Sequence, residues 1–155
     1  GVLVAMGGAV DAAASAAEGI RVSVPGGGRG TRTLETPGTL LRVQVDSGHP
    51  LGFGMPDEAA VYHTSCPVLE TELQTAGATR DVVMRFPETG PLLLSGWASG
   101  EERLRRRPAL LQAPAGSGRV ILCAFRPQFR GQTLGTFRIL FNAILDAGTG
   151  GDVSP

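Results

Sequence analysis

Lysine is absent from this sequence: all fourteen basic residues are arginine, and fourteen acidic residues balance them. A formal net charge of zero argues against a nucleic-acid-binding protein, which usually carries a clear basic excess. Long apolar runs are missing too, and none approaches the ~20 residues that a membrane-spanning helix needs. We therefore expect neither a nucleic-acid partner nor a membrane partner. The preference for arginine, together with abundant alanine and glycine, is typical of a GC-rich coding sequence.

Histidine and cysteine are scarce, with two of each. A catalytic zinc needs three protein ligands, and neither His49 nor His63 lies in a His-x-x-Glu or His-Glu-x-x-His pattern. We expect structural roles for both histidines and no metal or other cofactor in this chain. Cys66 follows His63 by three residues, a spacing that would put them on opposite faces of a strand.

Neither cysteine has the surroundings of a nucleophile. Cys66 precedes Pro67 instead of a helix, and Cys123 lies inside the apolar run 120–125. A reactive thiol needs a setting that lowers its pKa, such as a helix N-terminus. We expect both thiols to be reduced and Cys123 to be buried, and we identify no catalytic residue.

What the chain does contain is enough apolar sequence for one folded domain: 155 residues, of which 42% are hydrophobic. It opens directly on the apolar run 2–5, which reads as a core strand without an approach segment. We interpret the chain as a fragment whose natural N-terminus lies upstream.

Apolar periodicity and glycine or proline punctuation divide the chain into short elements. A strand, a tight turn and an alanine-rich helix come first, an order typical of doubly wound α/β domains. The glycine-rich segment 25–30 is expected to be a surface loop, because no Gly-Lys-Ser/Thr follows it. Strands are expected at 2–6, 20–24, 39–46, 59–63, 79–86 and 92–97, helices at 9–18 and 132–146, a helical turn at 100–107, and a hairpin of 109–113 and 119–125 around a five-residue loop, 114–118.

The last helix has a clear apolar pattern at helical spacing, which predicts a face packed on the sheet. The residues of that face are Phe137, Leu140, Phe141, Ile144 and Leu145.

A dense polar cluster follows the second hairpin strand, and its members are Arg126, Gln128, Phe129, Arg130 and Gln132. In open α/β sheets the carboxyl end of a strand is where ligands and partners dock. Two fixed guanidinium groups could bind a carboxylate. Alternatively, they bind carbonyls within the domain or face another domain. We therefore regard these five residues as the candidate binding or interface site.

The sequence also resembles a known family. The stretches that carry the resemblance are Leu94-Ser95-Gly96-Trp97, Gly100-Glu101-Glu102, Gly118 to Leu122, Phe125 to Thr133, Gly135-Thr136-Phe137 and Leu140 to Ala143. Through these stretches residues 94–145, and more weakly the segments around 37–43 and 46–56, are similar to the C-terminal region of bacterial zinc carboxypeptidases of the carboxypeptidase A-like family. One departure is Leu134, where relatives often carry histidine.

This resemblance implies a class I glutamine amidotransferase-like domain, with a flavodoxin-like sheet flanked by helices, a C-terminal β-hairpin and a final helix. Residues 1–147 would form this domain, incomplete at its N-terminus, and 148–155 a flexible tail. The zinc, its ligands and the catalytic Glu would belong to an upstream peptidase domain, so this chain alone would not be an enzyme. A secreted or periplasmic location is implied as well.

The function expected from this resemblance is that of a non-catalytic accessory domain, for interdomain docking, substrate access or oligomerisation. Its partner would be the upstream peptidase domain of the same parent protein, or a second copy of the chain. The alternative is a standalone carboxylate-, sugar- or peptide-binding module that uses the Arg126–Gln132 loop. An amidotransferase-like hydrolase is a third hypothesis.

Overall fold

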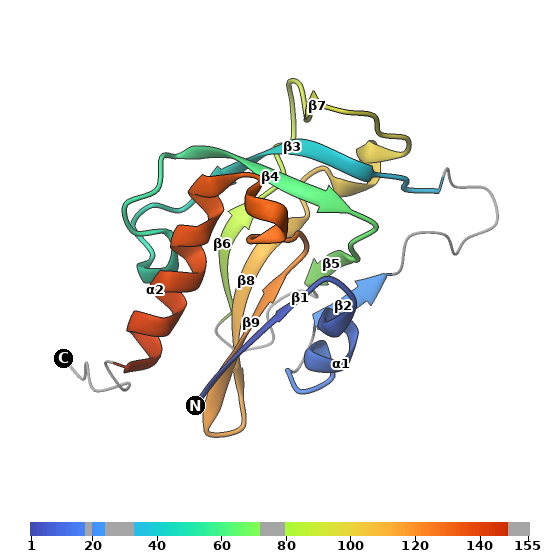
Figure 1. Cartoon of the computed structure of the whole chain (residues 1–155). Helices are drawn as coiled ribbons and strands as arrows, with labels where there is room; N and C mark the ends of the chain where they lie inside the picture. Colours follow the sequence, from blue (N-terminus) through green and yellow to red (C-terminus); the bar gives the residue numbers. More distant parts are fainter. Residues whose placement is uncertain (18–19, 24–32, 72–79, 149–155) are drawn as a thin grey trace.

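The computed structural model describes residues 1–17, 20–23, 33–71 and 80–148. A seven-stranded sheet runs in the order β1-β9-β8-β6-β3-β4, and β7 pairs with β3 beside this path (Figure 1). Of the strand pairs described in this sheet, β1 with β9 is parallel and the others are antiparallel. The strands are β1 Val2–Met6, β3 Pro37–Val45, β4 Glu58–Thr64, β6 Asp81–Arg85, β7 Leu93–Ser95, β8 Pro108–Ala115 and β9 Gly118–Cys123.

Both faces of this sheet are covered at β9, which explains why that strand is apolar from Val120 to Cys123. Ile121 and Cys123 point into a core shared with helix α2 (Phe137–Gly148). Val120 and Leu122 point into a second core, shared with helix α1 (Val10–Ala14). The α/β class, the C-terminal hairpin and the final helix predicted from the sequence are confirmed.

A small second sheet lies beside α1 and pairs β2 (Ile20–Ser23) with β5 (Val68–Thr71) in antiparallel fashion. Strand β5 was not predicted, because its four residues are too few to show an alternating pattern. The predicted helix 9–18 is shorter than expected, since a 3-10 turn (η1, Gly7–Ala9) precedes α1 and α1 ends at Ala14. The glycine-rich segment 25–30 lies outside the described residues.

The loop of the β8–β9 hairpin is tighter than predicted. Ala115 pairs with Gly118, so the turn consists of Gly116 and Ser117 rather than the whole segment 114–118. Gly116 adopts φ +57, as the common two-residue hairpin turns require. Pro114 has no main-chain N–H to donate, yet it can belong to the strand. The pairing of β8 with β6 ends at Gln112, so no carbonyl of β6 needs a hydrogen bond from residue 114.

The prediction for the final helix was wrong in its start and in its buried face. The 3-10 turn η4 (Phe129–Gly131) lies just before the expected start, a second 3-10 turn, η5 (Leu134–Thr136), occupies the expected first turn, and α2 begins at Phe137. Its buried residues are Ile139, Asn142 and Ala143, whereas Phe141, Ile144 and Leu145 are exposed and Phe137 and Leu140 are half-buried.

The physical reason is that α2 has apolar residues nearly all round, so helical spacing alone does not select a face. Two contacts determine which face of α2 is turned towards the sheet. The Nδ2 of Asn142 donates hydrogen bonds to the carbonyls of Leu51 and Phe53, at 3.0 Å each, in and beside the 3-10 turn η2 (Pro50–Gly52). Arg119 on β9 forms an ion pair with Asp146, at 2.9 Å.

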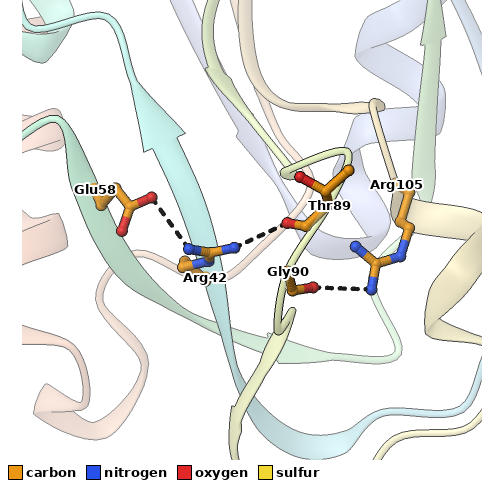
Figure 2. Close-up of polar contacts among 5 residues, drawn as sticks. All are labelled: Arg42, Glu58, Thr89, Gly90 and Arg105. Atoms are coloured by element: carbon orange, nitrogen blue, oxygen red, sulfur yellow. Dashed lines mark hydrogen bonds and ion pairs between the residues drawn. The ribbon is translucent and has the colours of Figure 1, made fainter.

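Arginines also hold the turn that follows β6 (Figure 2). Arg42 on β3 reaches the carboxylate of Glu58 (3.2 Å) and the carbonyl of Thr89 (3.0 Å). Arg105 donates to the carbonyl of Gly90, at 3.1 Å. Arg105 follows η3 (Glu101–Leu104), the helical turn expected at 100–107. These contacts show how arginine serves the fold here, by binding main-chain carbonyls.

Candidate functional site

The parallel pairing of β1 with β9 brings the C-terminal ends of these two strands together. Met6, the last residue of β1, lies opposite Cys123, the last residue of β9. The chain then leaves β1 at Gly7 with φ +57, and leaves β9 towards Arg126. Between them lies a pocket of about 440 Å³. Its lining consists of Val4, Met6, Gly7, Ala9, Arg126, Gln128 and Phe129.

Arg126 is held in place by main-chain and aromatic contacts. Its amide donates to the carbonyl of Tyr62 on β4, at 3.0 Å. Its guanidinium carbon lies 5.3 Å from the centre of the Phe129 ring, within cation–π range. The Phe129 ring is itself stacked on Tyr62, with centroids 5.1 Å apart and an interplanar angle of 9°. The guanidinium therefore sits on an aromatic pair anchored to the sheet.

The charge of Arg126 has no acidic partner among the described residues. Ion pairs do neutralise other arginines, such as Arg42 with Glu58 and Arg107 with Glu70. The Nε of Arg126 is buried and has no hydrogen-bond partner. Arg126 as a whole is half-buried, and even partial removal of a charge from water is costly unless the charge is paired. This part of the site is thus suited to an anion.

Neither thiol can serve as a nucleophile here. Cys66 and Cys123 are free, and both are fully buried. Burial raises the pKa of Cys66, an effect that outweighs the opposing influence of Arg126. Burial, and to a lesser degree the neighbouring Cys66, raises the pKa of Cys123 to about 12. Both thiols therefore stay protonated at neutral pH, and the expectation that Cys123 is buried is confirmed.

The two histidines have structural contacts. The Nδ1 of His63 lies 2.7 Å from the hydroxyl of Thr36, and the ring packs edge-on against Phe86. The Nδ1 of His49 accepts a hydrogen bond from the amide of Leu51 and caps η2. Across the residues that the structure describes, no cluster of three or more His, Cys, Asp or Glu could hold a metal ion.

The structure brings together only part of the predicted site. Arg126, Gln128 and Phe129 line the pocket, whereas Arg130 lies outside the lining and contacts the Phe129 ring, with its guanidinium carbon 5.3 Å from the ring centre. Gln132 is exposed and does not line the pocket. The β1 side of the pocket, Val4 to Ala9, was missed. Its signal was the Gly7-Gly8 pair after a buried strand, but only the β1–β9 pairing places it beside Arg126.

A second surface feature is an exposed apolar stripe on α2 and the turn before it, which we call the α2 stripe. Its members are Leu134, Phe141, Ile144 and Leu145, with exposed fractions of 61% to 74%. Beside it, Phe53 is 70% exposed. Leu145 and Phe53 line a shallow hollow of about 450 Å³ that also includes Asn142 and Asp146.

Among the described helices, none is long and apolar enough to cross a membrane.

Comparison with known proteins gives a resemblance in fold. No family model matches the sequence, and a search of curated proteins found no match. The chain is similar in structure to a protein from Thermoplasma acidophilum that is provisionally named as a subunit of GMP synthase, with a TM-score of 0.46 and 13% sequence identity. The similarity covers 84% of this chain and 50% of that protein, so this chain spans about half of its length.

Proposed function

We propose that this chain is a non-catalytic accessory domain of a bacterial zinc metallocarboxypeptidase-like protein, and that it docks on the peptidase domain of the same parent protein. The observation that carries the docking is the α2 stripe, because large apolar side chains gathered on one face usually mark an interaction surface. The sequence resemblance of residues 94–145 supports the choice of partner.

Two features favour docking over catalysis. The buried, protonated thiols leave the described part of the chain without a cysteine nucleophile. The α2 stripe also starts directly after the Arg126–Gln132 loop, whose residues Arg130 and Gln132 are exposed. An apolar patch bordered by arginine and polar side chains has the composition of a protein interface.

The test is association of this chain with the separately expressed peptidase domain of the parent protein. We expect Phe141→Ser combined with Ile144→Ser to weaken binding at least tenfold and to leave the melting temperature unchanged, because both side chains are exposed. Arg130→Ala should weaken binding and also leave the domain folded. The matched control is Leu94→Ser, a half-exposed leucine outside the α2 stripe.

Failure has two clear forms. If the wild-type chain does not bind the peptidase domain, the choice of partner is wrong. If it binds but the α2 variants bind equally well, the peptidase domain uses another surface. Sedimentation analysis of the isolated chain addresses the homo-oligomer: a dimer dissociated by Phe141→Ser would assign the α2 stripe to a second copy of the chain instead.

A further inference from the structure

The pocket between the ends of β1 and β9 has one polar end and otherwise apolar walls. Val4, Met6 and Ala9 provide the apolar lining from the β1 side, and Phe129 provides apolar lining from the segment that follows β9. Arg126 and Gln128 are its polar side chains. A volume of about 440 Å³ lies within the range of small-molecule sites, which typically combine apolar walls with a few placed polar groups.

The fixed position of Arg126 and its positive charge both favour the binding of an anion. Phe129 packs against the guanidinium, and Gly7 lies close to it: a Cβ on Gly7 would lie 3.7 Å from Nε and 3.8 Å from Nη2. The absence of a side chain at Gly7 keeps this end of the pocket open. Because the guanidinium is already held in place, little side-chain entropy remains to be lost on binding.

No neighbour in the described structure neutralises this charge. The salt bridges of the other arginines do not extend to Arg126, and its Nε lacks any hydrogen-bond partner. Cys66 interacts with Arg126, but its thiol is fully buried and neutral. The positive charge at the end of the pocket is thus left for a ligand.

The lining also selects the kind of anion. A guanidinium fork matches the two oxygens of a carboxylate. Of the described residues that line the pocket, Arg126 alone is charged, and Arg130 is exposed outside the lining. One cation among apolar walls suits a singly charged ligand with an apolar body better than phosphate, which carries more than one negative charge at neutral pH and has no apolar body.

We propose that this pocket binds a small monocarboxylate with an apolar body, of the kind found in an acylated aliphatic amino acid, and that Arg126 pairs with the carboxylate while Val4, Met6 and Phe129 contact the apolar part. This site is separate from the α2 stripe and does not depend on the proposed docking.

The experiment titrates the full 155-residue chain with N-acetyl-L-leucine and follows backbone amide signals by NMR. We expect saturable shifts at Met6, Gly7 and Gln128, together with binding at least tenfold weaker for N-acetyl-L-leucinamide, in which a neutral carboxamide replaces the carboxylate. Equal binding of acid and amide would overturn the role of Arg126. Equal or tighter binding of inorganic phosphate would overturn the apolar selectivity.

Two variants separate ligand binding from folding. Arg126→Gln should reduce the affinity at least tenfold, but it also removes the contact with Phe129. Ala9→Phe keeps Arg126 and fills the pocket from an exposed position, so it should abolish binding with little effect on the melting temperature. Retained binding in Ala9→Phe would refute the site. Arg103→Gln, outside the pocket, is the matched charge control, and Phe141→Ser should bind the acid normally whether or not the docking proposal holds.

Discussion

The Oγ1 atom of Thr36 lies 2.7 Å from the Nδ1 atom of His63, and both residues are buried. Thr36 precedes β3, and His63 is near the end of β4. The second ring nitrogen of His63 has no hydrogen-bond partner in the described structure. The site therefore holds a neutral imidazole and offers nothing to stabilise its charged form.

This arrangement predicts acid destabilisation. Burial lowers the pKa of His63 from 6.5 to about 4. The unfolded chain takes up the proton near pH 6.5, but the folded chain does so only near pH 4. The contribution of His63 to the free energy of unfolding is fully present above pH 6.5, and about 3 kcal/mol of it is lost as the pH falls to 4. Below pH 4 this group causes no further change.

Urea unfolding of wild type and His63→Gln at pH 7 and pH 4 measures this effect. The difference in unfolding free energy between the two pH values should be smaller by about 3 kcal/mol in the variant. Identical pH dependence in wild type and His63→Gln would show that His63 is not the group responsible.

The two thiols should be unreactive in the native chain. Cys66 and Cys123 have no solvent exposure, and burial raises the pKa of each. Since the thiolate is the reactive form, a thiol reagent should label neither residue in the native protein within minutes and both after denaturation. Ser117→Cys in the exposed hairpin turn is the positive control. A Cys66–Cys123 disulfide in the intact mass of freshly purified protein would contradict this prediction.

Two substitutions on α2 should differ sharply in their cost. Ile139 is fully buried, so Ile139→Ala should reduce the unfolding free energy by ~2–5 kcal/mol. Phe141 is 61% exposed, so Phe141→Ala should cost less than about 1 kcal/mol. Chemical denaturation of both variants makes the comparison. The pattern of apolar residues alone would have assigned the larger cost to Phe141, and that result would restore the sequence-based face of the helix.

Asn142 is the polar link between α2 and η2. Its Nδ2 donates to the carbonyls of both Leu51 and Phe53, so Asn142→Ala should destabilise the fold by ~1–3 kcal/mol. Asn142→Asp should cost at least as much, because a carboxylate has no hydrogen to donate. Gln132→Ala, an exposed amide near the same helix, serves as control and should be neutral. Equal midpoints for Asn142→Ala and wild type would refute the link.

Much of the fold follows from local sequence. Strands such as β3 alternate apolar and polar residues, and the β8–β9 hairpin combines two apolar runs with glycine between them. The buried state of Cys123 also follows from its apolar neighbours. The length of the hairpin turn could not be predicted from local sequence. Pro114 and Gly118 belong to the paired strands instead of the loop, and pairing depends on both strands together.

The candidate site divides in the same way. Sequence by itself determined that Arg126, Gln128 and Phe129 lie together after a buried strand, because they are neighbours in the chain. Only the tertiary structure decided that Val4 to Ala9 complete the pocket, since the parallel pairing of β1 with β9 joins segments more than a hundred residues apart. It also decided which face of α2 is buried: helical spacing permits two apolar faces, and the hydrogen bonds of Asn142 to η2 select one of them.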